Sequence, residues 1–191
     1  MRKVHDATGL PPLRRRAAGF TGLIRIIIGQ QLSVASANAI WARCVAGIKP
    51  MRAATIAGLN DDALRACGLS GPKIRTLRAI SDAVISRNLK LRGLATSSDE
   101  EVHAALTAVS GIGPWTADIY ILACLGRADA FAAGDLALQI AAQHAFDLDD
   151  RPTADDLLQR AENWRPWRSV SARLLWSYYR VVKSRNSGAP I

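Results

Sequence analysis

Apolar residues recur at three- and four-residue spacing along nearly the whole chain, and this pattern limits the possible folds more than any other feature. Such spacing places apolar side chains on one face of an α-helix, whereas a half-buried strand alternates apolar and polar residues. One stripe runs from Phe20 to Ile28 and ends at Gly29, and others cover residues 74–85 and 167–182. Almost no strand pattern is present. The sequence therefore predicts an all-α protein of many short helices joined by short loops.

Capping residues indicate where some of these helices begin. Ser98 and Glu101 have the spacing of a capping box before an apolar run, which predicts one helix from Ser98 to Val109. Thr153 and Asp156 have the same kind of spacing. By contrast, the two ends of the chain, "MRKVHDATGLPPLRRRA" and "KSRNSGAPI", are expected to be poorly ordered or loosely packed.

The composition limits the size and the location of the protein. With 191 residues and 49% hydrophobic content, the chain suffices for one compact two-lobed domain or two small domains. Its most apolar stretch, "GLIRIIIGQ", is short and interrupted by Arg25, so no transmembrane helix is expected. The first residues lack the apolar segment of a secretory signal. We therefore expect a cytoplasmic, nucleoid-associated protein in a prokaryote or a nuclear protein in a eukaryote.

The charge indicates the kind of partner. A formal net charge of +9 and a pI of about 10.2 favour a polyanionic partner, most simply nucleic acid, although a solubilising surface charge would give the same values.

The three cysteines, Cys44, Cys67 and Cys124, are widely spaced, without a C-x-x-C motif. That spacing argues against a zinc site, a disulfide framework and a cysteine-ligated cluster.

The stretch "SGIGPWTADIY" is a glycine-rich turn into a helix that starts with proline. Gly111 can take a left-handed conformation that ends one helix, Gly113 lets the backbone approach a ligand, and Pro114 suits the first helical position. The amides that follow are then expected to be unpaired at the helix start, in Trp115, Thr116 and Ala117. Such amides would bind a DNA phosphate, as in a helix–hairpin–helix module. An ordinary turn between helices has a similar pattern. The choice between a phosphate-binding hairpin and an ordinary turn therefore depends on the basic pI and on the residues described below.

A candidate catalytic carboxylate lies further along the chain, in "ADAFAAGDLALQ". Asp135 follows Gly134 and precedes an apolar helical run, so it is expected to cap a helix N-terminus, which stabilises and aims a carboxylate. The stretch "NWRPWRSVSARLLWSYYR" then supplies several aromatic residues. Most of these are expected in the core or at interfaces, while one or two can stack on an extruded base.

Together these stretches resemble the helix–hairpin–helix (HhH-GPD) DNA glycosylase superfamily, most closely its 3-methyladenine DNA glycosylase II (AlkA-like) branch. The resemblance is carried by "FTGLIRIIIGQQLSVASA", "GLSGPKIRTL", "VSGIGPWTADIYIL" with "DAFAAGD", and "WRPWRSVSARLLWSYY". Larger bacterial members carry an extra N-terminal β-rich domain, for which this chain has no room. The chain is therefore similar to the compact form.

The resemblance implies a single glycosylase domain over residues 1–191, built as two helical lobes with the active-site cleft between them. Residues 30–126 would form a helical barrel that holds the hairpin at residues 107–117. Residues 1–29 together with residues 127–191 would form the second lobe.

The resemblance also implies roles for single residues. Asp135 would be the catalytic carboxylate at the junction of the lobes, and Trp115 and Trp176 would line the pocket for the flipped base. Ile119 stands where the family has a further pocket aromatic, a departure that bears on which bases fit. The residue that fills the hole left by the flipped base falls in "GQQLS". Position favours Gln31, with Gln30 and Leu32 as alternatives.

Two further expectations rest on the resemblance alone. A monovalent cation, Na⁺ or K⁺, would be held in the hairpin by the main-chain carbonyls of Thr107, Val109 and Ile112. No other cofactor is expected, and three cysteines cannot supply the four-cysteine iron–sulfur motif of the endonuclease III branch.

The expected reaction is hydrolysis of an N-glycosidic bond in double-stranded DNA. Family members that also cut the strand carry a lysine nucleophile where this sequence has Trp115, so a monofunctional enzyme acting as a monomer, away from membranes, is expected. An alkylated purine such as 3-methyladenine is the expected base, because its positive charge makes it a good leaving group. The alternatives are a glycosylase for oxidised or deaminated bases, a non-catalytic DNA-binding protein, and a small-molecule enzyme, for which no motif is present.

Overall fold

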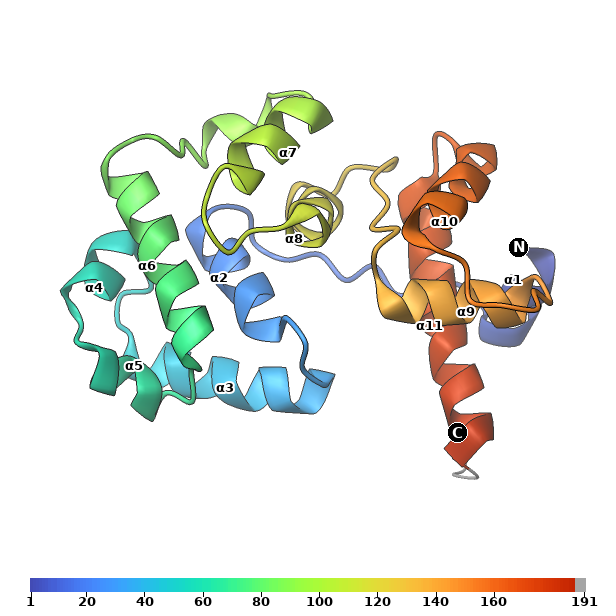
Figure 1. Cartoon of the computed structure of the whole chain (residues 1–191), viewed down its shortest axis with the longest axis horizontal. Helices are drawn as coiled ribbons and strands as arrows, with labels where there is room; N and C mark the ends of the chain where they lie inside the picture. The colour runs from blue at the N-terminus through green and yellow to red at the C-terminus, as the bar shows by residue number, and fades with distance from the viewer. Residues whose placement is uncertain (188–191) are drawn as a thin grey trace. The chain divides into compact units, whose positions relative to one another are not determined.

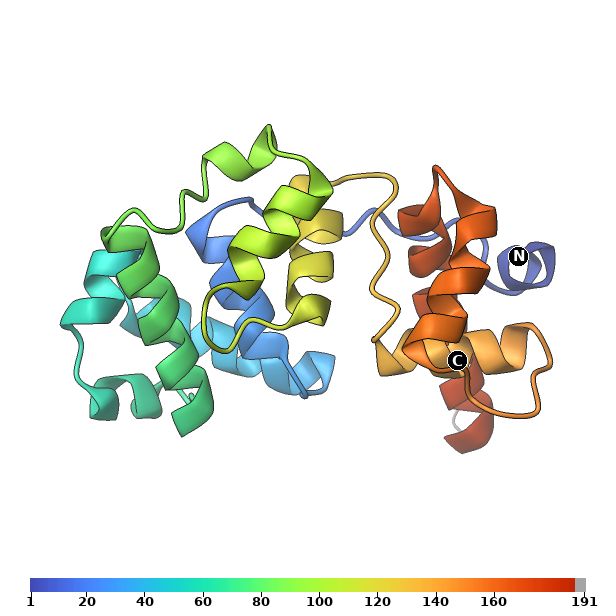
Figure 2. The same ribbon diagram turned by 45° about the horizontal axis from the view of Figure 1, so that its top comes forward.

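The computed structural model describes residues 1–187, which form helices joined by short connections and contain no strand (Figures 1 and 2). The all-α prediction is therefore confirmed over that range. The chain forms two compact units. The terminal unit comprises Met1–Arg15 and the described residues from Gly126 onward, and the central unit comprises Arg16–Leu125. No helix in the described residues is long and apolar enough to span a membrane.

The central unit packs its helices around α2, whose apolar face is almost fully buried. Its elements are α2 (Phe20–Gly29), α3 (Val34–Gly47), α4 (Ala53–Gly58), α5 (Asp61–Ala66), α6 (Gly71–Ile85), a 3-10 helix (Gly93–Ala95), α7 (Asp99–Thr107), α8 (Pro114–Ile119) and a π-helix (Tyr120–Leu125). Helix α2 contacts α3, α6, α8 and the π-helix, while α6 also covers α4 and α5. The hairpin is thus the connection between α7 and α8.

The limits of the units differ from those of the expected lobes. We expected residues 20–29 to join residues 127–191, but α2 belongs to the central unit because its partners lie there. The segment before α2 is held in the same unit, since the amide of Arg16 donates to the Ala123 carbonyl at 2.8 Å. The amide of Gly19 likewise donates to the buried hydroxyl of Tyr120 at 2.8 Å.

The terminal unit packs around the long helix α11 (Arg168–Ser187), which contacts both α9 (Leu136–Ala145) and α1 (Arg2–Thr8). Helix α10 (Ala154–Ala161) and a 3-10 helix (Glu162–Trp164) complete it. The expectation of a loose N-terminus is wrong for α1, because Val4 is fully buried there. At the other end, residues 183–187 continue α11, and residues 188–191 lie outside the described part of the chain.

The expected helix starts are confirmed. In α7 the amide of Glu101 donates to Ser98 Oγ at 3.2 Å, and the Glu101 carboxylate accepts from the Ser98 amide at 2.8 Å. Thr153 and Asp156 form the same reciprocal pair at α10. Helix α7 ends at Thr107 rather than at the expected Val109, so the turn that follows is longer than the sequence indicated.

Candidate functional site

Asp135 is the N-cap of α9, as the sequence predicts. Its Oδ1 accepts hydrogen bonds from the amides of Ala137 and Leu138, at 2.9 and 3.1 Å. Helix α11 supplies a third donor, the indole Nε1–H of Trp176, at 3.1 Å from the same oxygen. Three N–H groups and the positive end of α9 therefore orient the carboxylate and suit its negative charge. The structure thus brings together two of the residues that the resemblance implicated.

The loop that delivers Asp135 has no regular secondary structure, yet its conformation is tightly constrained. Its apolar side chains at residues 130–133 are buried. The Asp135 amide donates to the Ala132 carbonyl at 2.9 Å, and Gln139 Nε2 donates to the Ala133 carbonyl at 3.0 Å. A half-buried carboxylate on such a loop can face positive charge that grows on a sugar without reorganising.

The two glycines of the hairpin have different roles. Gly111 has φ of +86°, the left-handed conformation expected, and a Cβ at this position would overlap the Thr76 hydroxyl of α6. Gly113 is the N-cap of α8 with φ of −96°, an ordinary conformation for any residue. A Cβ at Gly113 would meet no atom within 4 Å. Gly111 is therefore required for packing, while Gly113 leaves open space at the start of α8.

The expectation of unpaired amides at the start of α8 is wrong for Thr116 and Ala117. The amides of Thr116 and Ala117 both donate to the Gly113 carbonyl, at 3.0 and 3.2 Å. These two N–H groups are therefore bonded within the first turn of α8 and are not available to bind a phosphate. Pro114 is nevertheless the first residue of α8, as predicted.

The turn at residues 30–32, after α2, presents its side chains unequally. Gln30 Nε2 donates to the buried Oγ1 of Thr116 at 2.8 Å, so this side chain is directed to α8. Gln31, with φ of +56°, is exposed, and Leu32 is 40% exposed. Of the three candidates for the wedge, Gln31 and Leu32 therefore remain accessible.

Lys73 of α6 holds this turn, a role that the sequence reasoning missed. Its ammonium donates to the carbonyls of Ile28 and Gln30, at 2.6 and 3.0 Å. Burial lowers the pKa of Lys73 from its ordinary value, because the charged form is partly desolvated. The available signal was the glycine-rich stretch "GLSGPKI", which leads into α6 and contains this lysine.

The remaining site residues lie on the hairpin and on α8. Trp115 is half-buried and Ile119 is buried, four residues further along the same helix. Among the carbonyls expected to hold a cation, that of Val109 accepts the Ile112 amide at 3.1 Å. A carbonyl has two lone pairs, so this bond is compatible with a cation ligand. Thr107 is the last residue of α7, and Ile112 lies in the connection between α7 and α8.

The family model described as the HhH-GPD superfamily of base excision DNA repair proteins matches residues 24–166. The DNA-3-methyladenine glycosylase 1 of Schizosaccharomyces pombe is 33% identical, over 81% of this chain and 69% of that protein. A putative DNA-3-methyladenine glycosylase of Bacillus subtilis is 30% identical, over 81% of this chain and 56% of that protein.

Solved structures agree with the sequence matches. The S. pombe 3-methyladenine DNA glycosylase Mag1, in complex with abasic DNA, superposes with a TM-score of 0.84 at 30% identity, covering 92% of this chain and 88% of that one. An 8-oxoguanine glycosylase/lyase of Clostridium acetobutylicum, at 17% identity and a TM-score of 0.75, shares the fold. Because the family match covers residues of both units and includes the hairpin, this chain belongs to the HhH-GPD superfamily of base excision DNA repair proteins.

Proposed function

We propose that this protein is a monofunctional DNA glycosylase that removes alkylated purines, such as 3-methyladenine, from double-stranded DNA by hydrolysis. The observation that carries the proposal is the carboxylate of Asp135, held at the N-terminus of α9 by two amides and by the Trp176 indole. The relatives named as 3-methyladenine glycosylases support the choice of base.

The chemistry follows from the bond that breaks. As the N-glycosidic bond lengthens, positive charge grows on the sugar, and a fixed carboxylate near C1′ stabilises it. Asp135 would also orient the water that attacks C1′. Alkylation at N3 or N7 gives the purine a positive charge before the reaction, so the base leaves with little need for a general acid.

The aromatic residues would hold the flipped base. A cationic purine is attracted to an indole face by about 0.5–2 kcal/mol, which suits Trp115 and Trp176. Ile119, in place of a further aromatic, would leave one wall of the pocket aliphatic. We expect this wall to influence which alkylated bases are accepted.

DNA binding would use the central unit. We propose that Gln31 or Leu32 fills the space left by the flipped base, because these two side chains are exposed at the turn. The backbone at Gly113 would approach a phosphate, since nothing lies within 4 Å of its Cβ position. The net charge of +9 suits a polyanion, and phosphate contacts carry no sequence information.

Three further proposals concern the state of the protein. It would act as a monomer on genomic DNA, in the cytoplasm of a prokaryote or the nucleus of a eukaryote. A sodium or potassium ion at the carbonyls of Thr107, Val109 and Ile112 would stiffen the hairpin. Replacing these ions with tetramethylammonium at constant ionic strength should then weaken DNA binding, and an unchanged affinity would contradict the cation site.

Base release from methylated DNA tests the proposed function. Duplex DNA treated with dimethyl sulfate is incubated with the protein, and the released bases are separated by chromatography. We expect free 3-methyladenine and no covalent DNA adduct after borohydride reduction, because Trp115 replaces the lysine nucleophile. Binding of DNA without base release would favour a non-catalytic protein, and release from a duplex that carries oxidised or deaminated bases, but not from the methylated duplex, would favour another lesion class.

A further inference from the structure

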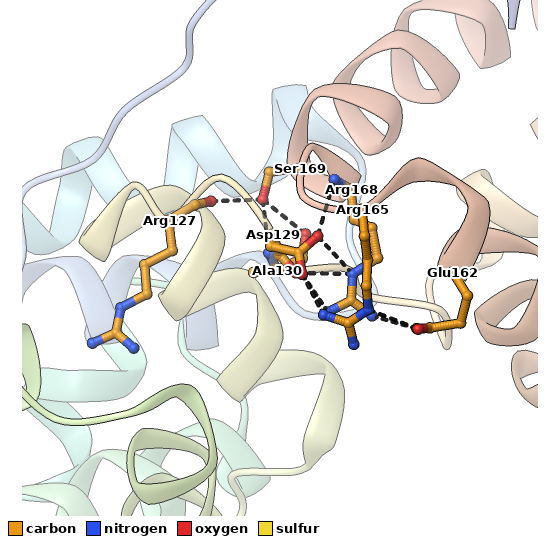
Figure 3. Close-up of polar contacts among 7 residues, drawn as sticks. All are labelled: Arg127, Asp129, Ala130, Glu162, Arg165, Arg168 and Ser169. Atoms are coloured by element: carbon orange, nitrogen blue, oxygen red, sulfur yellow. Dashed lines mark hydrogen bonds and ion pairs between the residues drawn. The ribbon is translucent and has the colours of Figure 1, made fainter.

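We propose that Asp129, Arg168 and Ser169 form a clamp, here called the Asp129 clamp, that positions Asp135 for the reaction. These residues act through Asp135 and are not themselves in contact with the reacting atoms in this proposal, which rests on the proposed function. The clamp lies entirely within the terminal unit (Figure 3). It uses residues of "WRPWRS", the motif for which the proposed reaction otherwise has no role.

The side chain of Arg168, the first residue of α11, binds both the carboxylate and the main-chain carbonyl of Asp129. Its Nε donates to the Asp129 carbonyl at 3.0 Å and to Oδ1 at 2.9 Å, while Nη2 donates to Oδ2 at 3.1 Å (Figure 3). The Arg168 side chain is only 12% exposed. A planar guanidinium matched to a carboxylate in this way fixes direction as well as distance.

Ser169 holds the main chain on both sides of Asp129. Its buried Oγ accepts the amide of Ala130 at 3.1 Å and lies 2.7 and 2.8 Å from the carbonyls of Arg127 and Ala130, either of which can accept its proton (Figure 3). The Ser169 amide donates to the Ala128 carbonyl at 2.9 Å. The first turn of α11 therefore supplies hydrogen-bond partners to main-chain groups of the loop that have none in a strand or helix.

One helix thus fixes both ends of the loop. At the start of the loop, α11 contributes Arg168 and Ser169, and at its end the same helix contributes Trp176, whose indole donates to Asp135. A helix rises about 1.5 Å per residue, so α11 sets a separation of roughly 12 Å between these two anchors. Between them Phe131 is buried and packs edge-on against Trp164, with ring centroids 5.6 Å apart. Loosening the first anchor should therefore shift the carboxylate at the second.

Arg165 provides a matched control. It also pairs with the Asp129 carboxylate and with Glu162, but it makes no described bond to the main chain of the loop, and its side chain is 51% exposed. Arg165→Gln removes a positive charge and an ion pair from the same carboxylate. It leaves the bonds from Arg168 and Ser169 in place.

The test compares Arg168→Gln and Ser169→Ala with Arg165→Gln in the full chain. The first readout is the indole ¹⁵N–¹H resonance of Trp176, assigned through Trp176→Phe, which reports its hydrogen bond to Asp135 without requiring activity. The second readout is the single-turnover rate of base release, measured beside the dissociation constant for undamaged DNA. Ser169→Ala alters no charge, so it remains informative if Arg168→Gln does not fold.

We expect both clamp variants to shift the Trp176 resonance and to lower the single-turnover rate roughly 10- to 100-fold, with DNA affinity changed less than about 2-fold. Arg165→Gln should leave the resonance and the rate near those of the wild type. A folded Ser169→Ala protein with an unchanged resonance would overturn the clamp, as would equal effects in Arg165→Gln. If the wild type releases no base, the proposed function fails, while the resonance still decides whether the clamp positions Asp135.

Discussion

The loop that ends at Asp135 and the turn at residues 30–32 are both irregular, and in each a basic side chain holds main-chain carbonyls. Arg168 binds the carbonyl of Asp129, and Lys73 binds the carbonyls of Ile28 and Gln30. The two segments belong to different units of the chain. In both segments, a basic side chain donates hydrogen bonds to main-chain carbonyls and so fixes a backbone that has no regular helical hydrogen bonds.

They differ in what happens to the functional side chain. Asp135 is bonded through Oδ1 to three donors, whereas Leu32 is 40% exposed on the turn that Lys73 supports. A group that must meet developing charge gains from being fixed in advance. A side chain that must fill a gap in DNA needs to be exposed to solvent on a backbone that is held in place. On the proposed function, the terminal unit would therefore supply the catalytic carboxylate and the turn of the central unit would contact DNA.

The largest expected effect is that of Asp135→Asn. The amide keeps the shape and still caps α9, because Asn is as good an N-cap as Asp, but the negative charge is lost. We expect single-turnover base release to fall by at least about 10²- to 10³-fold. Circular dichroism should show an intact fold. Turnover close to that of the wild type would remove Asp135 from the mechanism.

Trp176→Phe should have the next largest effect. Phenylalanine keeps an aromatic face for the base but removes the N–H that donates to Asp135 Oδ1. A hydrogen bond to a charged group is worth about 1.5–3 kcal/mol, so the rate should fall roughly 10-fold or more. Trp167→Phe, at a residue that is 61% exposed, is the control and should change the rate little. Equal rates in both variants would mean that the indole N–H is not needed.

The hairpin glycines should differ in stability rather than in rate. Gly111→Ala imposes a left-handed alanine and an overlap with Thr76, so it should lower the free energy of unfolding by about 1–3 kcal/mol. Gly113→Ala should change it by less than about 0.5 kcal/mol, because its φ is ordinary and its Cβ position is open. Urea denaturation of the two variants measures the difference. A similar loss in both would mean that Gly113 is also a packing residue.

The smallest expected effect is that of Lys73→Met. Loss of two bonds to carbonyls should loosen the turn at residues 30–32 and weaken DNA binding by about 5-fold, with the single-turnover rate at saturating enzyme nearly unchanged. Lys90→Met removes one exposed positive charge from the same unit and controls for electrostatic attraction. Equal losses of affinity would show that Lys73 contributes charge alone. A binding titration at several salt concentrations separates the two cases.

Local signals predicted the parts of the site that depend on neighbouring residues. The capping boxes, the left-handed Gly111 and the N-cap at Asp135 each follow from residues only a few positions apart. The amides of Thr116 and Ala117 were predicted wrongly because the sequence does not show how tightly the first turn of α8 closes.

Long-range contacts were beyond such signals. The bonds from Lys73 to the turn after α2 and from Arg168 to Asp129 join residues that are distant in sequence, and no spacing rule brings them together. The role of Trp176 was implied by family resemblance, and only its position on α11 shows that it donates to Asp135. Helix α1 was missed because its one fully buried residue, Val4, makes no stripe.

A crossed measurement tests the division between chemistry and binding most directly. The dissociation constant and the single-turnover rate are measured on one methylated duplex for Asp135→Asn and for Gly113→Val. We expect Asp135→Asn to lose the rate and keep the affinity. Gly113→Val should bind damaged and undamaged DNA more weakly by similar factors, with the log–log salt slope flattened by up to about 0.9, while its rate at saturating enzyme falls much less. Parallel loss of rate and affinity in both folded variants, or unchanged affinity and salt slope in Gly113→Val, would contradict this account.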